Sequence, residues 1–538
     1  MCGIFLAHQS NKNKEELDIL FEKIHYRGPD FSGSFMLDKT YYGFHRLAII
    51  NPSSGCNQPF YDSENKIVLI CNGEIYNWHE LCKKYELPEE ESSDCEVILH
   101  LYKKIGFSAM VKELNGEFAI ILHDRLQNKI YACRDICGTR PLYFSYCNGH
   151  LYLASELKCI PNANVNHIKP RNIYIFSDTK YEIQPYWIYP SEFTKIPVIT
   201  ENYTTTSLIA QYNDIADDLY KILYDSVAQR LETDREKGFF LSGGIDSSII
   251  CALAQKIYST NERIKCFTIG MDDSPDVLAA KEVAQFLNVD LTVIPFNIQQ
   301  AINDLPELIW HLETYDITTI RASAAQFTAC KWIANNTDIK VVYSGEVADE
   351  LLSSYLYSKF APNLKALHKD AVKLLSEIHY FDALRLDRTC ASQGLECRVP
   401  YMNREYIEYV LKLHPEFRRC DNQIEKYIIR HMACKYNLLP TNVINRQKNA
   451  FSDGISGKSN WISALKKYAL ETFADIDFIN EMKKYEHLQP ETLEQLLYRK
   501  LFESTYPDRE HILPHFWMPK WCNANDPSAS VLNVFNNE

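Results

Sequence analysis

The stretch "GFFLSGGIDSSIICALAQKI", residues 238–257, determines the class of the second half of this 538-residue chain. "GFFL" is typical of a short strand, "SGG" of a turn and "IDSSIICALAQKI" of a helix. At a strand-to-helix turn, free N–H groups and the positive end of the helix dipole favour an anion. The adjacent Gly243 and Gly244 let the backbone approach a phosphate chain. The stretch therefore predicts a phosphate-binding turn, with an ordinary tight turn as the alternative.

The turn lacks the GK[ST] sequence of a Walker loop, so it suits pyrophosphate as a leaving group while the α-phosphate reacts. Asp246 is a candidate ligand for Mg²⁺, which prefers carboxylate and phosphate oxygens. The stretch "VVYSGEVADELL", residues 341–352, repeats the strand–turn–helix pattern. It supplies Asp349 as a second candidate metal ligand and Glu346 as a candidate base, although acids at a helix start also favour its dipole. Ligands of open α/β sheets bind at such carboxyl ends of strands.

The chain divides into two parts that differ in their pattern of predicted strands and helices. Residues 1 to about 185 are rich in short β-branched and aromatic runs, which predict a sandwich of sheets. From about 214, strands alternate with helices, which predicts a doubly wound parallel sheet, and the region after about 360 is mainly helical. We therefore expect domains at 1–190 and 214–538, joined by a linker at 191–213.

The composition narrows the class of protein. The net charge of −13 disfavours a broad nucleic-acid surface, and the hydrophobic fraction of 46 % is that of a folded protein. No apolar run is long enough to cross a membrane, and the polar N-terminus does not resemble a signal peptide. The 17 scattered cysteines contain no CxxC pair, so we expect buried thiols in a reducing compartment and no cysteine-based metal site.

The N-terminal "MCGIF" places a cysteine at position 2, which chance alone could do. Removal of Met1 would give Cys2 a free α-amine beside its thiol. Because the reference pKa of such an amine is about 8, it can act as the base for that thiol. Position alone does not decide between the two explanations.

Several motifs together resemble one family. "SGGIDSS" (242–248) resembles the pyrophosphate motif of ATP pyrophosphatase domains. The N-terminal half resembles the class II glutamine amidotransferases in "MCGIF" (1–5), "RGPD" (27–30), "HRLAII" (45–50), "NGEIYN" (72–77) and "SDCEVILHLY" (93–102). The family that joins the two in this order is glutamine-hydrolysing asparagine synthetase, which the stretches 313–323, 395–403, 446–455 and 517–530 also resemble. The resemblance covers nearly the whole chain and is greatest to the eukaryotic branch.

The resemblance implies an αββα N-terminal-nucleophile domain in which Cys2 attacks the glutamine amide. Asn72 and Gly73 would form the oxyanion hole, Arg46 would pair with the glutamine α-carboxylate, and Glu74 and Asp94 would hold its α-ammonium. The implied glutamine-binding residues are Arg46, Leu47, Ala48, Ile49, Ile50, Asn72, Gly73, Glu74 and Asp94. Taken singly, Arg46 could instead form a surface salt bridge and Asp94 a helix N-cap.

In the second half the resemblance implies that ATP and Mg²⁺ activate L-aspartate as β-aspartyl-AMP, which ammonia converts to asparagine. The implied ATP-binding residues are Leu241, Ser242, Gly243, Gly244, Asp246, Ser247, Ile269, Ser344 and Gly345, and the implied metal ligands are Asp246 and Asp349. Glu346 would take a proton from ammonia and Lys448 would offset phosphate charge. Thr318, Thr319 and Arg321 are candidates for the aspartate pocket. The resemblance also implies an ammonia channel between the domains, a homodimer and a cytoplasmic location.

Two positions depart from the family pattern. Val347 stands where the family usually has glycine, and Asn403 where aspartate is common. We expect an ordinary backbone at Val347, because a β-branched residue poorly tolerates positive φ. The alternatives that stay open are an amidotransferase for another carboxylate, a non-catalytic ATP-binding relative weakened at Val347, and a nucleic-acid-modifying pyrophosphatase.

Overall fold

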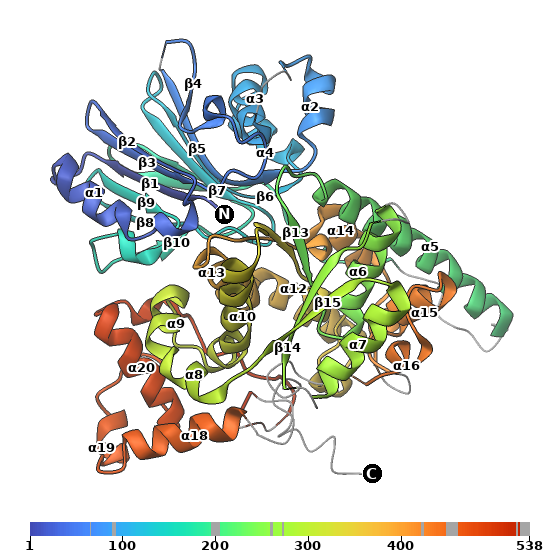
Figure 1. Cartoon of the computed structure of the whole chain (residues 1–538). Coiled ribbons are helices and arrows are strands. Elements are labelled where there is room, and N and C mark those ends of the chain that lie inside the picture. Colours follow the sequence, from blue (N-terminus) through green and yellow to red (C-terminus); the bar gives the residue numbers. More distant parts are fainter. Residues whose placement is uncertain are drawn as a thin grey trace.

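A computed structural model describes most of the chain (Figure 1). The described residues are 1–64, 66–88, 93–194, 205–258, 262–271, 274–420, 424–447, 461–522, 524 and 526–527. Lys448, the residue predicted to offset phosphate charge, lies outside them.

The N-terminal part consists of two stacked six-stranded antiparallel sheets (Figure 1). The first sheet, in spatial order, contains β10 (Asn166–His167), β8 (Tyr143–Cys147), β9 (His150–Ala154), β1 (Gly3–His8), β3 (Thr40–Arg46) and β2 (Phe31–Leu37). The second contains β12 (Tyr181–Pro185), β11 (Asn172–Phe176), β7 (Lys129–Arg134), β6 (Gly116–Asp124), β5 (Ile67–Ile75) and β4 (Phe60–Tyr61).

Alternation along the strands separates two apolar layers. On β1, Ile4 and Leu6 pack between the sheets with residues such as Ile70, whereas Phe5 faces outward. Phe5 packs on that outer side against Phe21 of α1 (Lys14–Glu22). The other sheet is covered by α2 (Trp78–Tyr85), α3 (Val97–Ile105) and α4 (Phe107–Glu113) (Figure 1). The predicted αββα sandwich is confirmed.

The second part is built on a five-stranded parallel sheet in the order β15 (Asp290–Pro295), β14 (Lys265–Gly270), β13 (Lys237–Phe240), β16 (Val341–Tyr343) and β17 (Glu396–Arg398). The chain starts in the centre at β13, winds outward to β15, then returns to the other side at β16. The direction of winding therefore reverses between β13 and β16, and this is where ligands bind in sheets of this class.

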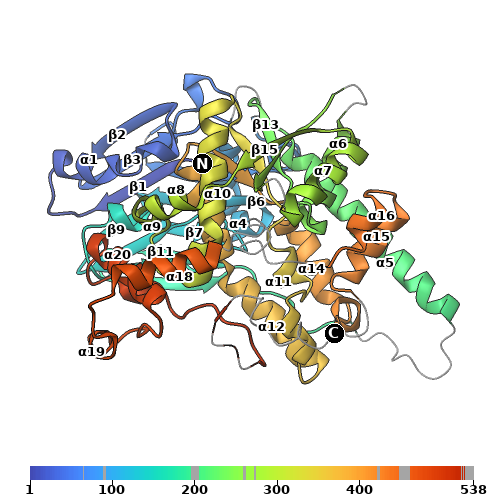
Figure 2. The ribbon, with the colours of Figure 1, turned by 60° about the horizontal axis from the view of Figure 1, so that its bottom comes forward.

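Helices cover both faces of the parallel sheet, as predicted for a doubly wound fold (Figure 1, Figure 2). One face carries α6 (Ile245–Ile257) and α7 (Pro275–Leu287), and the other carries α10 (Ile317–Asn336). The remaining helices are α5 (Thr205–Arg230), α8 (Ile298–Asn303), α9 (Leu305–Leu312), α11 (Ala348–Leu351), α12 (Leu364–Glu377), α13 (Asp382–Ala391), α14 (Arg404–Lys412), α15 (Tyr427–Lys435), α16 (Thr441–Ile444), α18 (Trp461–Thr472), α19 (Phe478–Met482) and α20 (Leu493–Thr505).

The region between the sheets differs from the expectation. Helix α5 begins at Thr205, so the last nine residues of the predicted 191–213 linker are helical. The buried positions Ala216, Leu219, Leu223 and Val227 give this helix its apolar face, and the helix extends beyond that face to Thr205. The cysteines are free and most of them are buried, as expected. Within the described ranges, no helix is long and apolar enough to cross a membrane.

Candidate active sites

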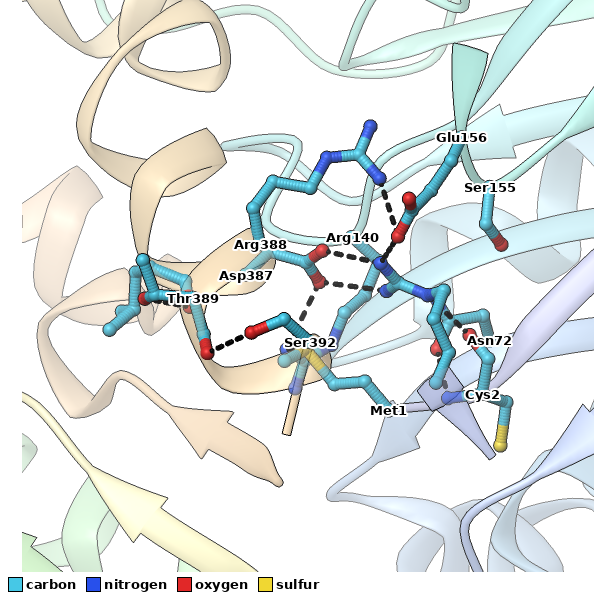
Figure 3. A network of polar contacts seen from close by, with 12 residues as sticks. Met1, Cys2, Asn72, Arg140, Ser155, Glu156, Asp387, Arg388, Thr389 and Ser392 are labelled. Carbon is cyan, nitrogen blue, oxygen red and sulfur yellow. Dashed lines mark hydrogen bonds and ion pairs between the residues drawn. The ribbon is translucent and has the colours of Figure 1, made fainter. Parts of the chain in front are cut away.

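Cys2 lies directly before β1, where the two sheets and the second part of the chain meet (Figure 3). Its backbone N–H donates to Asn72 Oδ1 at 2.8 Å, and its Sγ lies 3.8 Å from the carbonyl oxygen of Leu47. Asn72 stands on β5, in the sheet opposite to that of β1. The stacking of the sheets thus joins two residues that are 70 positions apart.

The other end of the Asn72 side chain is placed for a ligand. Its Nδ2 is buried and has no hydrogen-bond partner among the described residues. A buried donor without a partner is costly unless a ligand satisfies it. The neighbouring Gly73 is restricted to glycine, because a Cβ there would lie 2.2 Å from the carbonyl oxygen of Glu117 on β6. These contacts support the predicted oxyanion hole.

Cys2 requires a base to become a nucleophile. Burial raises the pKa of its thiol to about 11, so the thiol is protonated at neutral pH. The Met1 ammonium is buried 3.9 Å from Glu396 Oε2, and burial lowers its pKa. Removal of Met1 would make the Cys2 nitrogen the terminal α-amine. This amine would lie next to the Cys2 thiol and beside Asn72 Oδ1.

Arg46 is engaged with its own loop. Its two Nη atoms donate to the carbonyl oxygens of Ser53, Ile50 and Asn51 and to Asn57 Oδ1, at 2.6–3.2 Å. The guanidinium is 5 % exposed, so it is not a surface salt bridge. A glutamine carboxylate would share this cation with the loop or displace some of the loop contacts.

The segment from Leu47 to Ile50 is anchored from both parts of the chain. Ala48 N donates to Asp30 Oδ2 of the "RGPD" motif at 2.8 Å. The carbonyl oxygens of Ala48 and Ile49 accept from Arg235 Nε at 2.6 Å and from the backbone N–H of Asp234 at 3.0 Å. This anchoring fixes the Leu47 carbonyl beside Cys2.

Asp94 and Glu74 are both buried near this centre. Ser93 is the N-cap of the 3₁₀ turn that Asp94 begins, while Asp94 Oδ2 accepts from the backbone N–H of Ile75 at 2.8 Å. Burial raises the Asp94 pKa to about 6, although the Ile75 hydrogen bond opposes the shift. Glu74 Oε2 lies 3.0 Å from Arg398 Nη2 on β17, so the second domain already pairs with this carboxylate.

The second site is a cavity of about 310 Å³ at the reversal between β13 and β16. The glycine turns after the two strands pack against each other, because a Cβ on Gly345 would lie 2.6 Å from Ser247 N. Gly243 has φ +72°, which also requires glycine. The cavity is lined by all the predicted ATP residues, namely Leu241, Ser242, Gly243, Gly244, Asp246, Ser247, Ile269, Ser344 and Gly345.

Asp246 and Asp349 lie on either side of one ammonium group. Lys426 Nζ is 2.6 Å from Asp349 Oδ1 and also contacts Asp246 Oδ2. Burial would lower the Lys426 pKa, but the two carboxylates raise it overall. The two acids are therefore within reach of a single cation, as a shared Mg²⁺ site requires.

Lys426 and Arg446 are site residues that the sequence did not reveal. Arg446 Nη1 donates to the carbonyl oxygen of Gly243 at 3.2 Å, and its Nη2 lies 2.5 Å from Asp276 Oδ1. Both cations line the cavity. A basic residue near polar neighbours is usually solvated, so neither position stands out by itself, although Arg446 begins the stretch 446–455 that resembles the family.

Glu346, the candidate base, also lines the cavity. Arg385 Nη2, from α13, lies 3.0 Å from Glu346 Oε1 and 2.6 Å from Asp382 Oδ1. Nearby, burial and then the Asp382 and Asp349 carboxylates raise the Glu350 pKa to about 8. The buried site therefore favours the protonated form of Glu350 more than water does.

The three aspartate-pocket candidates differ in their positions. Thr318 lines the cavity, and its Oγ1 is buried with no hydrogen-bond partner within the described part of the chain. Thr319 instead bonds the N-cap of α10, since its N–H and hydroxyl both donate to Asp316 Oδ2 at 2.8 Å. Arg321 lines the cavity while pairing with Glu494 and Asp526 at 2.7–3.1 Å.

The expected ordinary backbone at Val347 is wrong. Val347 has φ +78° and ψ −21°, the left-handed conformation that a β-branched residue adopts at a cost of about 1–2 kcal/mol. Its side chain is 1 % exposed. The turn between Gly345 and α11 requires this conformation, and burial of the isopropyl group offsets part of its cost. The other departure, Asn403, caps α14 by accepting from Tyr406 N at 3.0 Å, a role that aspartate could also fill.

Comparisons with known proteins agree with this geometry. A family model described as glutamine amidotransferase domain matches residues 1–199, and one described as asparagine synthase matches residues 218–370 and 359–525. A protein of Acanthamoeba polyphaga mimivirus, named "Probable asparagine synthetase", is 38 % identical over 99 % of this chain and 100 % of its own length. Glutamine-hydrolysing asparagine synthetases of Cricetulus griseus and Homo sapiens are each 36 % identical over 99 % of both chains. The chain therefore belongs to the glutamine-hydrolysing asparagine synthetase family.

Proposed function

We propose that this chain converts L-aspartate to L-asparagine with ATP, using ammonia that Cys2 releases from L-glutamine. The overall reaction is that of the family to which the chain belongs. The observation that best supports Cys2 and Asn72 as the catalytic residues is the hydrogen bonding of the Asn72 side chain. Its Oδ1 accepts from Cys2 N while its buried Nδ2 has no partner in the described residues.

In the glutaminase reaction, Cys2 Sγ forms a bond to the side-chain amide carbon of glutamine. The thiol proton passes to the Cys2 α-amine, which hydrogen-bonds Asn72 Oδ1, and then to the departing ammonia. Asn72 Nδ2 donates to the oxyanion of the tetrahedral intermediate. Water then cleaves the thioester and releases glutamate. Arg46, Glu74 and Asp94 supply charges that match the α-carboxylate and α-ammonium of glutamine.

In the synthetase reaction, an oxygen of the aspartate β-carboxylate attacks the α-phosphorus of ATP and the bond to pyrophosphate breaks. Ammonia then attacks the acyl carbon of β-aspartyl-AMP, AMP leaves, and Glu346 takes the surplus proton. Arg385 orients Glu346 through its 3.0 Å contact. Thr318 Oγ1 can donate to or accept from the bound aspartate. Lys426 and Arg446 place positive charge at the phosphate turn, and Lys448 is proposed to do the same.

Mg²⁺ is proposed to bind Asp246 and Asp349, where its charge would neutralise the pyrophosphate leaving group. The fit rests on the Asp246 and Asp349 carboxylates, which both contact Lys426 Nζ and therefore lie close together. We further propose domains at 1–190 and 214–538, a homodimer and a cytoplasmic location, each supported by the resemblance to the family.

The test incubates the Met1-processed protein with ATP, Mg²⁺ and aspartate, plus either glutamine or ammonium. Asparagine, glutamate, AMP and pyrophosphate are measured together. Equal amounts of asparagine and AMP with glutamine are expected, and Cys2→Ala should make asparagine only with ammonium. Glutamate formed without AMP would show another acceptor or a failed synthetase half, and saturable ATP binding without AMP would favour a non-catalytic relative. Light scattering tests the homodimer.

A further inference from the structure

We propose that Asp387, on α13 of the synthetase domain, is a positioning residue of the glutaminase centre and acts through Arg27. The proposal rests on Cys2 being the glutaminase nucleophile. Figure 3 shows Asp387 of α13 close to the residues around Cys2, at the boundary between the two parts of the chain.

Arg27 is the link between the two residues. Its Nε donates to the carbonyl oxygen of Cys2 at 3.0 Å. Its Nη1 and Nη2 donate to Asp387 Oδ2 and Oδ1 at 2.9 and 3.1 Å, the paired geometry that fixes both the position and the plane of a guanidinium. Arg27 is fully buried and Asp387 is 1 % exposed, so water does not compete for these bonds.

Among the described residues, two side chains hold the backbone of Cys2 by hydrogen bonds. Asn72 Oδ1 accepts from its nitrogen, and Arg27 Nε donates to its carbonyl oxygen. Processing of Met1 removes the covalent support on the N-terminal side, so the two hydrogen bonds then carry more of the positioning of the Cys2 residue. A displacement of about 1 Å at a reacting group can cost about 100-fold in rate.

The other acid on Arg27 cannot replace Asp387. Glu156 Oε1 accepts from Arg27 Nη1 at 2.6 Å, but it also lies 2.7 Å from Arg388 Nη1. The second oxygen of Glu156 pairs with Lys158 Nζ at 2.5 Å. Glu156 is thus shared among three cations, and it accepts from only one nitrogen of Arg27, Nη1. Loss of Asp387 would release Nη2 and let the guanidinium rotate.

The same helix reaches the other active site. Arg385 on α13 contacts Glu346, and Asp387 follows it by two residues. Side chains two residues apart lie on nearly opposite sides of a helix, so one helix can contact both centres. Asp387 therefore ties the position of Cys2 to an element that carries part of the synthetase site.

The test measures glutamine hydrolysis by Met1-processed Asp387→Asn, Asp387→Glu and Glu313→Gln proteins. Glu313 is the matched control, since it is 1 % exposed and binds the glutaminase domain through Leu157 N and Lys158 N at 2.8 and 2.9 Å. Within the described residues it makes no hydrogen bond or ion pair with Arg27 or Cys2. For Asp387→Asn we expect kcat to fall about tenfold or more with KM nearly unchanged, while ammonium-dependent asparagine synthesis persists. Glu313→Gln should keep the wild-type kcat.

Two further measurements separate positioning from stability. If Asp387 acts through Arg27, the Arg27→Lys/Asp387→Asn double variant should be no slower than Arg27→Lys alone, because effects on one chain of contacts are not additive. Asp387→Glu keeps the charge but moves the carboxylate by one methylene, so it should also lower kcat. This variant decides the matter if Asp387→Asn does not fold.

The proposal is overturned if Asp387→Glu has wild-type kcat, since charge balance alone would then suffice. It is also overturned if Glu313→Gln loses as much kcat as Asp387→Asn, or if the Arg27 and Asp387 effects multiply. Cys2→Ala serves as the reference: hydrolysis that survives in Cys2→Ala would refute the proposed function instead.

Discussion

The two active sites of this chain are held together in different ways. The glutaminase centre lies on strands, where β1 and β5 of two stacked sheets bring Cys2 to Asn72. The synthetase centre lies on two turns, and its charged side chains come from α13, the start of α15 and the chain after α16. Each of these strands is fixed within its own sheet by the ladder of backbone hydrogen bonds to its neighbours, and the stacking of the sheets fixes the two against each other. A turn depends on special φ values and on neighbours that are remote in sequence.

The difference is also electrostatic. The glutaminase centre contains an unsatisfied neutral donor, Asn72 Nδ2, within the described residues. In the synthetase cavity, carboxylates are paired with cations of the same chain, as in Asp246–Lys426–Asp349 and Glu346–Arg385. In the proposed reactions the Asn72 donor would bind a developing oxyanion, whereas the paired charges of the second site would meet the highly charged ATP. Substitution of Asn72 should therefore act mainly on catalysis, and substitution of a paired charge such as Lys426 should act also on stability.

The largest effect is expected for Asn72→Ala. Loss of the oxyanion donor should lower kcat of glutamine hydrolysis by about 10²–10³-fold, with ammonium-dependent synthesis intact. Steady-state glutamate release measures the first and asparagine formation the second. Gln58→Ala is a control, because Gln58 binds the same strand through Cys71 N and O at 2.6 and 3.1 Å and makes no polar contact with Cys2 within the described part of the chain. A similar loss in both variants would contradict the assignment.

Lys426→Met should destabilise the fold by about 3 kcal/mol, because it leaves Asp246 and Asp349 facing each other without their common cation. Added Mg²⁺ should restore part of the thermal midpoint, since it can take the place of the ammonium. Differential scanning calorimetry with and without Mg²⁺ measures both effects. Lys331→Met, which removes an exposed pair with Glu307, should change stability by at most about 1 kcal/mol and show no response to Mg²⁺. A loss that Mg²⁺ does not reduce would argue against the shared cation site.

Val347→Gly should cost less stability than the same change at Val399. Both side chains are buried and both precede a short helix, but φ is +78° at Val347 and −124° at Val399. Relief of the left-handed conformation should therefore make Val347→Gly about 1–2 kcal/mol less destabilising. Chemical denaturation of the two variants provides the comparison. Equal losses would show that the strain is relaxed in solution.

The smallest effect is expected from pH. Burial raises the Asp94 pKa to about 6, whereas an ordinary aspartate has a pKa of about 4. As pH falls through 6, Asp94 therefore becomes protonated and loses the negative charge that would hold the glutamine α-ammonium. Glutamine affinity should therefore decline as pH falls through about 6. Calorimetric titration of Cys2→Ala between pH 5 and 8 measures binding without turnover. An Asp94→Asn substitution in that background should remove the decline, and a decline that persists would assign it to another group.

Much of the fold could be predicted because its signals are local. Short runs rich in β-branched and aromatic residues predicted the sandwich, and two strand–glycine–helix stretches predicted the ligand-binding edge of the parallel sheet. The resemblance then pointed to Cys2, Asn72 and Asp246, and the structure places Cys2 beside Asn72 and Asp246 in the second cavity. The prediction placed the start of helix α5 too late, because residues 205–213 carry little apolar periodicity of their own. Packing of the later turns extends the helix back to Thr205.

The amino-acid sequence by itself determined the order of the two domains, the nature of both glycine turns and the candidate nucleophile, because each depends on residues adjacent in the chain. Only the tertiary structure decided that Lys426 lies between Asp246 and Asp349, that Arg385 holds Glu346, that Val347 is left-handed and that Asp387 reaches Cys2 through Arg27. These are contacts or conformations imposed by parts of the chain far away in sequence. Buried charges must find partners wherever folding places them, so long-range packing, and not local pattern, selects those partners.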